Sequence, residues 1–182
     1  MRSLMQIFVA MVVCAVLSGC GTKAVYAPAP NAEKVNPEGK FSIGEIVDTS
    51  GFVFPADEKD PFSLTDAMRD ALKSELEKKN VLGTPGDYIL NGNITYYLPG
   101  NAFIRWLAPG AGRTELRTAW RVTDINGKEL ATIPVNSYVA AGGGYTIGAW
   151  KYVFSNVAEV LIKTLQNEDK RQGGPAPPPR PQ

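Results

Sequence analysis

The sequence contains no histidine and only two cysteines, Cys14 and Cys20. Without histidine, the chain lacks the commonest general base, the base of serine-hydrolase triads and the commonest metal ligand. An excess of positive charge is also absent, because 19 basic side chains face 18 acidic ones. Proteins that bind nucleic acids need surplus Lys and Arg to neutralise phosphates, so this balance argues against a nucleic-acid partner.

The acidic residues are spread over predicted helix and turn surfaces, and no spacing in the sequence brings two of them together in a cleft. Acid–base catalysis by paired carboxylates therefore has no support from the sequence. We expect a protein that is not an enzyme and that binds no metal and no cofactor.

One long apolar run is present, at the N-terminus. It follows the positive start Met1-Arg2-Ser3 and covers residues 4–17, interrupted only by Gln6. A run of 14 residues is too short for a permanent membrane-spanning helix but is typical of the apolar region of a secretory signal peptide.

The apolar run ends in Leu17-Ser18-Gly19-Cys20, which resembles the lipobox of bacterial lipoproteins. The resemblance implies that residues 1–19 are removed and that Cys20 carries acyl chains on its sulfur and on its new amino group. The alternative is an ordinary signal peptide followed by a chance cysteine. The residue after the cysteine is Gly21, whereas an aspartate at that position would resemble the signal that retains lipoproteins in the inner membrane. The glycine therefore favours a periplasm-facing lipoprotein of the outer membrane.

Two segments are expected to lie outside the folded domain. Residues 20–40 are rich in Pro, Ala, Asn and Lys, which is typical of a lipidated tether. Residues 169–182 form a disordered Pro-rich tail, either a solvated end or a ligand for an aromatic-lined groove. A single domain is expected over residues 41–168, and no thiol is left in it for a disulfide, so its core must stabilise it.

The periodicity of this domain predicts an α+β fold with about four strands and two amphipathic helices. Strands are expected at 41–47, 88–98, 113–124 and 128–139, and helices at 60–80 and 146–166. The dipeptide Asn126-Gly127 supplies the positive φ angles of a tight hairpin. The order strand-helix-strand-strand-strand-helix favours a mostly antiparallel sheet with both helices packed on one face.

Alternation within the strands predicts which side chains share a face. One face of the strand 88–98 is expected to hold Tyr88, Leu90, Ile94, Tyr96 and Leu98. In the strand 113–124, the arginines Arg113, Arg117 and Arg121 lie opposite Leu116, Thr118, Trp120 and Val122. The arginine row is either a solvated outer face with cross-strand partners such as Glu129, or a surface that recognises an acidic partner or a lipid headgroup.

A second candidate interface lies in the stretch "NAFIRWLAPG" at residues 101–110, which carries several apolar side chains between two strands. It is either a short strand in the core or an apolar flap that docks on a partner or a membrane. Arg105 and Trp106, together with Phe103, are our first candidates for interface residues, because Trp and Arg are enriched at binding hot spots.

Residues 110–144 resemble an uncharacterised family of bacterial lipoproteins. In that family G-x-G-[KR]-x-x-L opens a strand, D-x-x-G-K-x-L forms a hairpin and a glycine run precedes a final helix. The matching residues here are Gly110 to Leu116, Asp124 to Leu130 and Gly142 to Gly144. The order of elements is also similar to that of small envelope-assembly lipoproteins, which implies a subunit of a larger machine and carries over no catalytic residue.

These observations together favour a lipid-anchored periplasmic domain that serves as an accessory or scaffold subunit of a cell-envelope complex. Its expected partners are the membrane, through the acyl chains, and an envelope protein. The alternative is a lipoprotein that binds a solute or a glycan. In that case the side chains that stack on sugar rings would come from Tyr96, Tyr97, Trp106 and Trp120.

Overall fold

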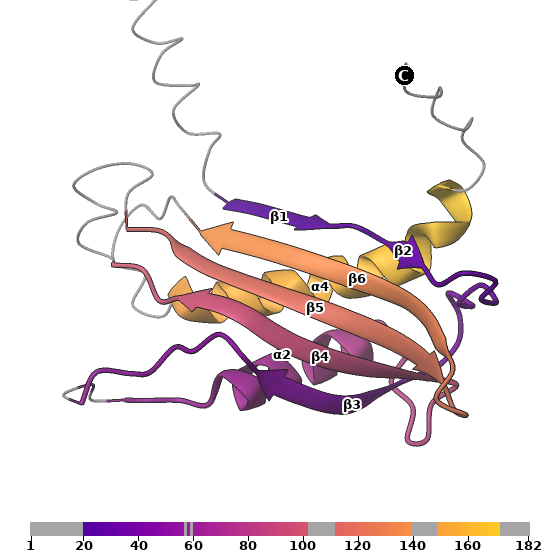
Figure 1. Ribbon diagram of the computed structural model, residues 1–182, viewed down its shortest axis with the longest axis horizontal. Coiled ribbons are helices and arrows are strands. Elements are labelled where there is room, and N and C mark those ends of the chain that lie inside the picture. The colour runs from indigo at the N-terminus through magenta and orange to yellow at the C-terminus, as the bar shows by residue number, and fades with distance from the viewer. Residues whose placement is uncertain (1–19, 57, 59, 102–111, 140–148, 172–182) are drawn as a thin grey trace, which may run out of the picture.

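The protein is described by a computed structural model that covers residues 20–56, 58, 60–101, 112–139 and 149–171 (Figure 1). Within these residues six strands form one sheet and two helices pack on one of its faces. The strands are β1 (Cys20–Ala24), β2 (Ala27–Pro28), β3 (Phe41–Asp48), β4 (Tyr88–Leu98), β5 (Thr114–Asp124) and β6 (Glu129–Val139). The helices are α2 (Leu64–Lys78) and α4 (Ala149–Arg171).

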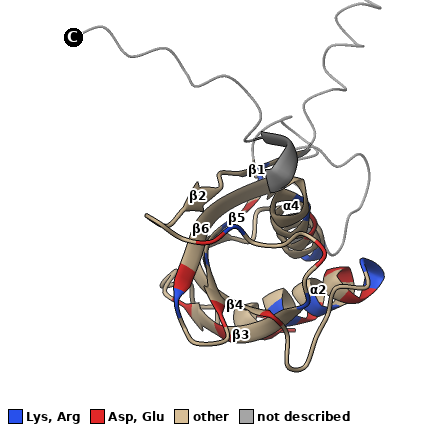
Figure 2. Ribbon diagram, turned by 90° about the vertical axis from the view of Figure 1, so that its right-hand side faces the viewer, with Lys and Arg blue, Asp and Glu red and all other residues tan. Residues whose placement is uncertain are grey.

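The order of strands across the sheet is β1-β6-β5-β4-β3, and β2 also pairs with β6. All neighbours are antiparallel except β3 and β4, which are parallel and are connected through α2. The sheet curves around the two helices (Figure 2). The predicted α+β class and the packing of both helices on one face are confirmed, whereas the predicted count of about four strands is wrong.

The two additional strands come from the segment that was expected to be a tether. β1 pairs with the end of β6, from Cys20 opposite Val139 to Ala24 opposite Val135. β2 continues along the same neighbour, and Val35 beyond it is buried. Of the prolines that suggested a tether, Pro28 lies in this edge strand, where a missing N–H removes no ladder hydrogen bond, and Pro30 and Pro37 lie in turns.

The hairpin between β5 and β6 forms at the predicted dipeptide. Gly127 has a φ of +82°, and its N–H donates to the carbonyl oxygen of Asp124 at 3.1 Å. The Asp124 carboxylate also accepts from the N–H groups of Asn126 and Lys128, at 2.8 and 2.9 Å. This local chemistry sets the register of β5 against β6.

Helix α2 is shorter than the predicted range 60–80, because it begins after Ser63 and ends at Lys78. The Ser63 hydroxyl accepts from the N–H of Asp66 at 3.1 Å and caps the first turn. Asn80, with a φ of 55°, reverses the chain just after the C-terminal turn. The buried side chains recur every fourth residue and bind the helix to the sheet: Leu64, Met68, Leu72 and Leu76.

A β-bulge in β4 changes the predicted face of this strand. The register with β5 shifts between Ile94 and Tyr96, and Thr95 is the extra residue. Beyond the bulge the alternation reverses, so Tyr97 is buried at 4% exposure while Tyr96 and Leu98 lie on the outer face. The prediction that Tyr96 and Leu98 share one face with Leu90 is therefore wrong.

The core contains two groups of aromatic rings. Trp120 is buried, its indole N–H donates to the Thr118 hydroxyl at 2.9 Å, and its ring packs against Gly92 on the neighbouring strand. A second group surrounds Tyr97, with ring centroids 4.9–6.3 Å apart. The Tyr97–Phe154 pair is tilted and the other pairs are edge-on, and the members are Phe52, Phe54, Phe62, Tyr97 and Phe154.

Candidate functional site

The most exposed part of the sheet is the face opposite the two helices, here called the outer face. Arg113, Arg117 and Arg121 all project from β5, or from the residue before it, onto this face. Arg121 is flanked by Asn91 on β4 and by Thr132 on β6. Glu129 lies opposite Thr123 instead, so the register does not make it the cross-strand partner of an arginine.

Glu115 is buried between the first two arginines. Its carboxylate Oε1 accepts from Arg117 Nε at 2.7 Å and also lies 2.7 Å from Nη2 of the same side chain. The Arg113 Nη2 lies 2.8 Å from Oε2, as an ion pair, since Oε2 has no hydrogen-bond partner among the described residues. The Glu115 side chain is 3% exposed, and the two arginines are 49% and 52% exposed.

The Arg117 guanidinium also lies over an aromatic ring. Its carbon Cζ is 4.9 Å from the centroid of Tyr96, a distance typical of a cation–π contact. Glu115 and Tyr96 therefore hold two guanidinium groups side by side, each with one side toward solvent. We call Arg113, Glu115 and Arg117 the arginine clamp.

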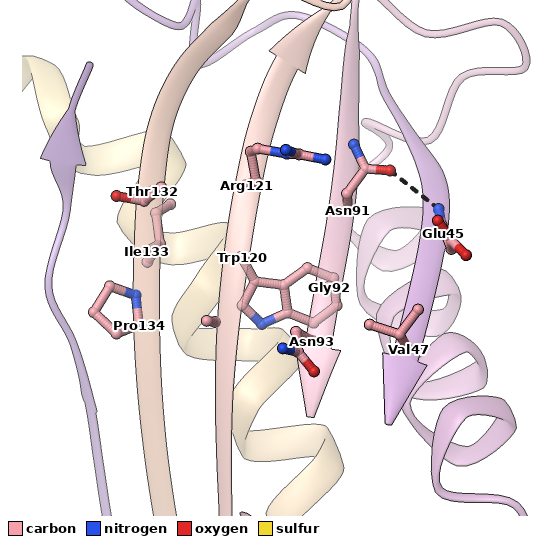
Figure 3. Close-up of a pocket in the computed structure, with 11 residues that line it drawn as sticks. Glu45, Val47, Asn91, Gly92, Asn93, Trp120, Arg121, Thr132, Ile133 and Pro134 are labelled. Atoms are coloured by element: carbon pink, nitrogen blue, oxygen red, sulfur yellow. Dashed lines mark hydrogen bonds between the residues drawn. The ribbon is translucent and has the colours of Figure 1, made fainter. Parts of the chain in front are cut away.

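An open groove of about 300 Å³ lies farther along the outer face (Figure 3). The outer face carries the short side chains of Ala119 and Pro134 at the centre of this groove, and Gly92 lines it with its backbone, while Glu45 and Arg121 stand at its rim. The remaining lining residues are Val47, Asn91, Asn93, Trp120, Thr132 and Ile133.

Much of the polar chemistry around this groove is already used by the fold. The Asn91 side-chain oxygen accepts from the N–H of Glu45 at 3.1 Å, at the point where the register of β3 shifts (Figure 3). From the helix side, Arg69 donates to the carbonyl oxygen of Gly44 at 3.1 Å. Trp120, below the groove, is only 1% exposed. The groove is therefore better suited to docking of a partner than to catalysis.

A second groove of about 420 Å³ lies between α2 and α4 on the opposite side of the molecule. Asp66 and Asp70 of α2 line it together with Lys151 of α4. In the part of the chain that the structure describes, no three acidic, Cys or His side chains come together as a metal site.

Burial has a marked electrostatic effect on one aromatic residue. It raises the pKa of the Tyr97 phenol well above the usual range, because the charged phenolate would lose its water. The hydroxyl has no hydrogen-bond partner among the described residues, and the ring is 4% exposed, so Tyr97 is a core residue.

The other predicted interface residues, Phe103, Arg105 and Trp106, lie outside the described residues. Cys20 is the first residue of β1.

Two residues near the arginine clamp were not selected from the sequence. The first is Lys23, which lies in the segment that was interpreted as a tether. The second is Tyr138, whose ring lies against Gly21. No helix within the described residues is long and apolar enough to cross a membrane.

The fold defines a small α+β domain with an open sheet that has helices on one side only. Residues 34–143 match the family called Domain of unknown function (DUF4410), and the chain belongs to this family. No curated protein matches this chain.

Several solved structures are similar to this chain at low sequence identity. A PelC dodecamer variant from Paraburkholderia phytofirmans is 10% identical, with a TM-score of 0.52 over 80% of this chain and 98% of that chain. A Xanthomonas campestris protein of the family-model DUF330 is 13% identical, with a TM-score of 0.46, and covers 82% of this chain and 98% of its own. A minor lipoprotein from Acinetobacter baumannii is 16% identical, with a TM-score of 0.37 over 72% of this chain and 93% of that chain.

Proposed function

We propose that this protein is a lipid-anchored, periplasm-facing subunit of a cell-envelope complex, with an accessory or scaffold role and no catalytic one, at the outer membrane. The observation that carries this proposal is the outer face of the sheet, which presents an open groove and a row of arginines on the side away from the helices.

The lipid anchor is supported by the sequence around Cys20. Leu17, two small residues and a cysteine follow an apolar run of signal-peptide length. One acyl chain binds a membrane only marginally, at about 0.8 kcal/mol per buried CH₂, whereas two or more chains anchor a protein stably.

A docking role is supported by the way the outer groove is built. Two of its polar side chains are used by the fold, since the side-chain oxygens of Asn91 and Asn93 accept from the N–H of Glu45 and from the hydroxyl of Thr49, while its centre is made of small residues that a partner can approach closely. PelC, which shares this fold, is a dodecamer. A domain of this fold can therefore serve as a subunit of an assembly, formed either from copies of one chain or with another envelope protein.

The glycan-binding alternative has less support. Two of the four aromatic residues expected to stack on sugars, Tyr97 and Trp120, are buried in the core. Tyr96 is 37% exposed but already contacts the guanidinium of Arg117. Trp106 lies outside the described residues.

The proposal is tested by crosslinking the tagged full-length protein in cells and identifying what is captured. Ala119 is exposed at the centre of the groove, between Asn93 and Pro134 on the neighbouring strands. The variant A119W fills the groove without touching the core, and S74W places the same side chain on the exposed side of α2 as a matched control.

We expect a reproducible envelope partner, or further copies of this chain, with wild type and S74W, and loss of that product with A119W. The variant R105A/W106A is tested in parallel, since those residues are the sequence-based candidates. Capture of no specific product by the folded wild-type protein would overturn the scaffold role. Incorporation of a labelled fatty acid into wild type but not into C20A tests the anchor separately.

A further inference from the structure

We propose that the end of the outer face next to Cys20 binds the phosphates of anionic lipid headgroups and so orients the domain on the membrane. This headgroup surface consists of Lys23, Tyr96, Leu98, Arg113, Arg117 and Tyr138. The inference rests on the proposed lipid anchor at Cys20 and specifies what the anchored domain does at the membrane surface.

The register of the sheet places these residues beside the anchored cysteine. Cys20 pairs with Val139, and Val139 pairs with Thr114, so Arg113 lies one position beyond the level of Cys20. Adjacent strands are about 4.8 Å apart, which puts this part of β5 roughly 10 Å from Cys20 across the sheet. An acyl chain on Cys20 would thus bring Arg113 to the depth of the headgroups.

A second row crosses the sheet slightly farther from the anchor. Lys23 pairs with Asn136, Asn136 with Arg117, and Arg117 with Tyr96. This row lies three residues along the strands from Cys20, a distance of about 10 Å. Lys23 and Arg117 point to the same face, and both are exposed.

No flexible linker separates the proposed anchor from the domain, because β1 begins at Cys20 itself. A long tether would let the domain rotate freely and would make its orientation independent of any one surface. Here the cysteine is the first residue of a paired strand, so acylation would press one end of the sheet against the bilayer.

The side chains have the chemistry that anionic headgroups require. An arginine has five N–H donors, and Glu115 engages only one side of each guanidinium in the clamp, which leaves donors for phosphate oxygens. With Lys23 the surface carries three positive charges against the single negative charge of Glu115. Tyr96, Tyr138 and Leu98 add the amphipathic and apolar groups that are common at the membrane–water interface.

The same strand supplies a matched control. Arg121 lies on the same face as Arg117, but it is opposite Thr132, whose other neighbour is Ala27 of β2. Along the strand it is seven residues from the level of Cys20, about 23 Å, which is more than twice the Debye length at physiological salt. Its charge should therefore contribute little to binding.

The experiment measures co-flotation of the mature chain, residues 20–182 with the substitution C20S, with lipid vesicles at physiological ionic strength. These residues contain every described helix and strand. The vesicles contain phosphatidylcholine alone or phosphatidylcholine mixed with phosphatidylglycerol. The first variant is K23Q, and the second is the triple R113Q/E115Q/R117Q, which leaves no unpaired carboxylate behind. The triple lowers the net charge by one, as R121Q does.

We expect binding to the anionic vesicles only. Each positive charge near an anionic surface contributes about fivefold, so K23Q and the triple variant should each weaken partitioning about fivefold, and the two combined about 25-fold. R121Q should stay within about twofold of the parent protein.

Equal losses for R121Q and the triple variant would mean that only overall charge matters, and would overturn the proposal. Absence of binding to anionic vesicles by the folded parent chain would overturn it too, as would binding of inorganic phosphate that displaces the vesicles at matched ionic strength. Fatty-acid labelling of Cys20 is read independently, so failure of the anchor and failure of the headgroup surface are distinguishable.

Discussion

For the arginine clamp we expect three substitutions to lower the free energy of unfolding less than two of them do. Arg113 and Arg117 are each about half exposed, so the loss of either one is partly screened by water and should cost about 1 kcal/mol. The double variant R113Q/R117Q is different, because it leaves the Glu115 carboxylate, which is 3% exposed, without a cation. We expect the double variant to lose about 3 kcal/mol, the lower end of the range for a buried charge deprived of its partner.

The triple variant R113Q/E115Q/R117Q removes the stranded charge as well. Replacement of a whole buried ion-pair network by neutral groups of similar size is often nearly neutral. The triple variant should therefore unfold within about 1 kcal/mol of wild type, although it carries one more substitution than the double variant. Leu98 and Tyr138 are the cross-strand neighbours of residue 115 in all of these variants.

The assay is urea denaturation, followed by circular dichroism, of wild type, the two single variants, the double variant and the triple variant. A common slope of the free energy of unfolding against urea concentration shows that the same surface is exposed on unfolding in each. A control, R121Q, removes an arginine of the same strand face that has no ion pair among the described contacts, and it should change stability by less than about 0.5 kcal/mol. If the double variant is no less stable than the triple variant, the arginines do not compensate Glu115 and the clamp is not an electrostatic unit.

Three further predictions concern the core and its edges. A Cβ at residue 92 would lie 2.7 Å from the Trp120 ring, so G92A should cost about 1–3 kcal/mol in urea denaturation, with less effect in a W120L background. S63A removes the acceptor that caps α2 and should lower stability by about 1 kcal/mol in the same assay; an unchanged midpoint would contradict the cap. The raised pKa of Tyr97 means that the unfolded phenol ionises first, so stability should be unaffected below about pH 10 and should fall as the pH rises above it. Melting temperatures of wild type and Y97F measured across this range should diverge, with the variant falling less.

Features specified by residues close together in the chain could be predicted from the sequence. The cap and the apolar stripe of α2 lie within one helix, and the hairpin at Gly127 depends on a dipeptide and one aspartate. The outward orientation of Arg117 and Arg121 follows from simple alternation. In each case the signal and the structure that it specifies span fewer than 20 residues.

Features that depend on a neighbouring strand could not be predicted. The residues around Thr95 do not predict a bulge, because the extra residue is defined only by the register with β5. The bulge exchanges the roles of Tyr96 and Tyr97, placing one under Arg117 and the other in the core. Likewise β1 has too little alternation to stand out, and its strand character depends on the free edge of β6.

The placement of β1 also changes what the arginine row means. As positions in a sequence, Arg113, Arg117 and Arg121 are equivalent, since each follows the last by four residues on the same strand face. The pairing of Cys20 with Val139 makes them unequal, because it gives the sheet one end at the proposed anchor and one end away from it. Two of the arginines fall at the anchored end, where Glu115 holds them as a pair, and the third stands at the rim of the outer groove. The two halves of this face can therefore meet different partners, a bilayer at the end near Cys20 and a protein at the groove. The comparison of the triple variant with R121Q tests this division directly, because both remove the same net charge from the same strand.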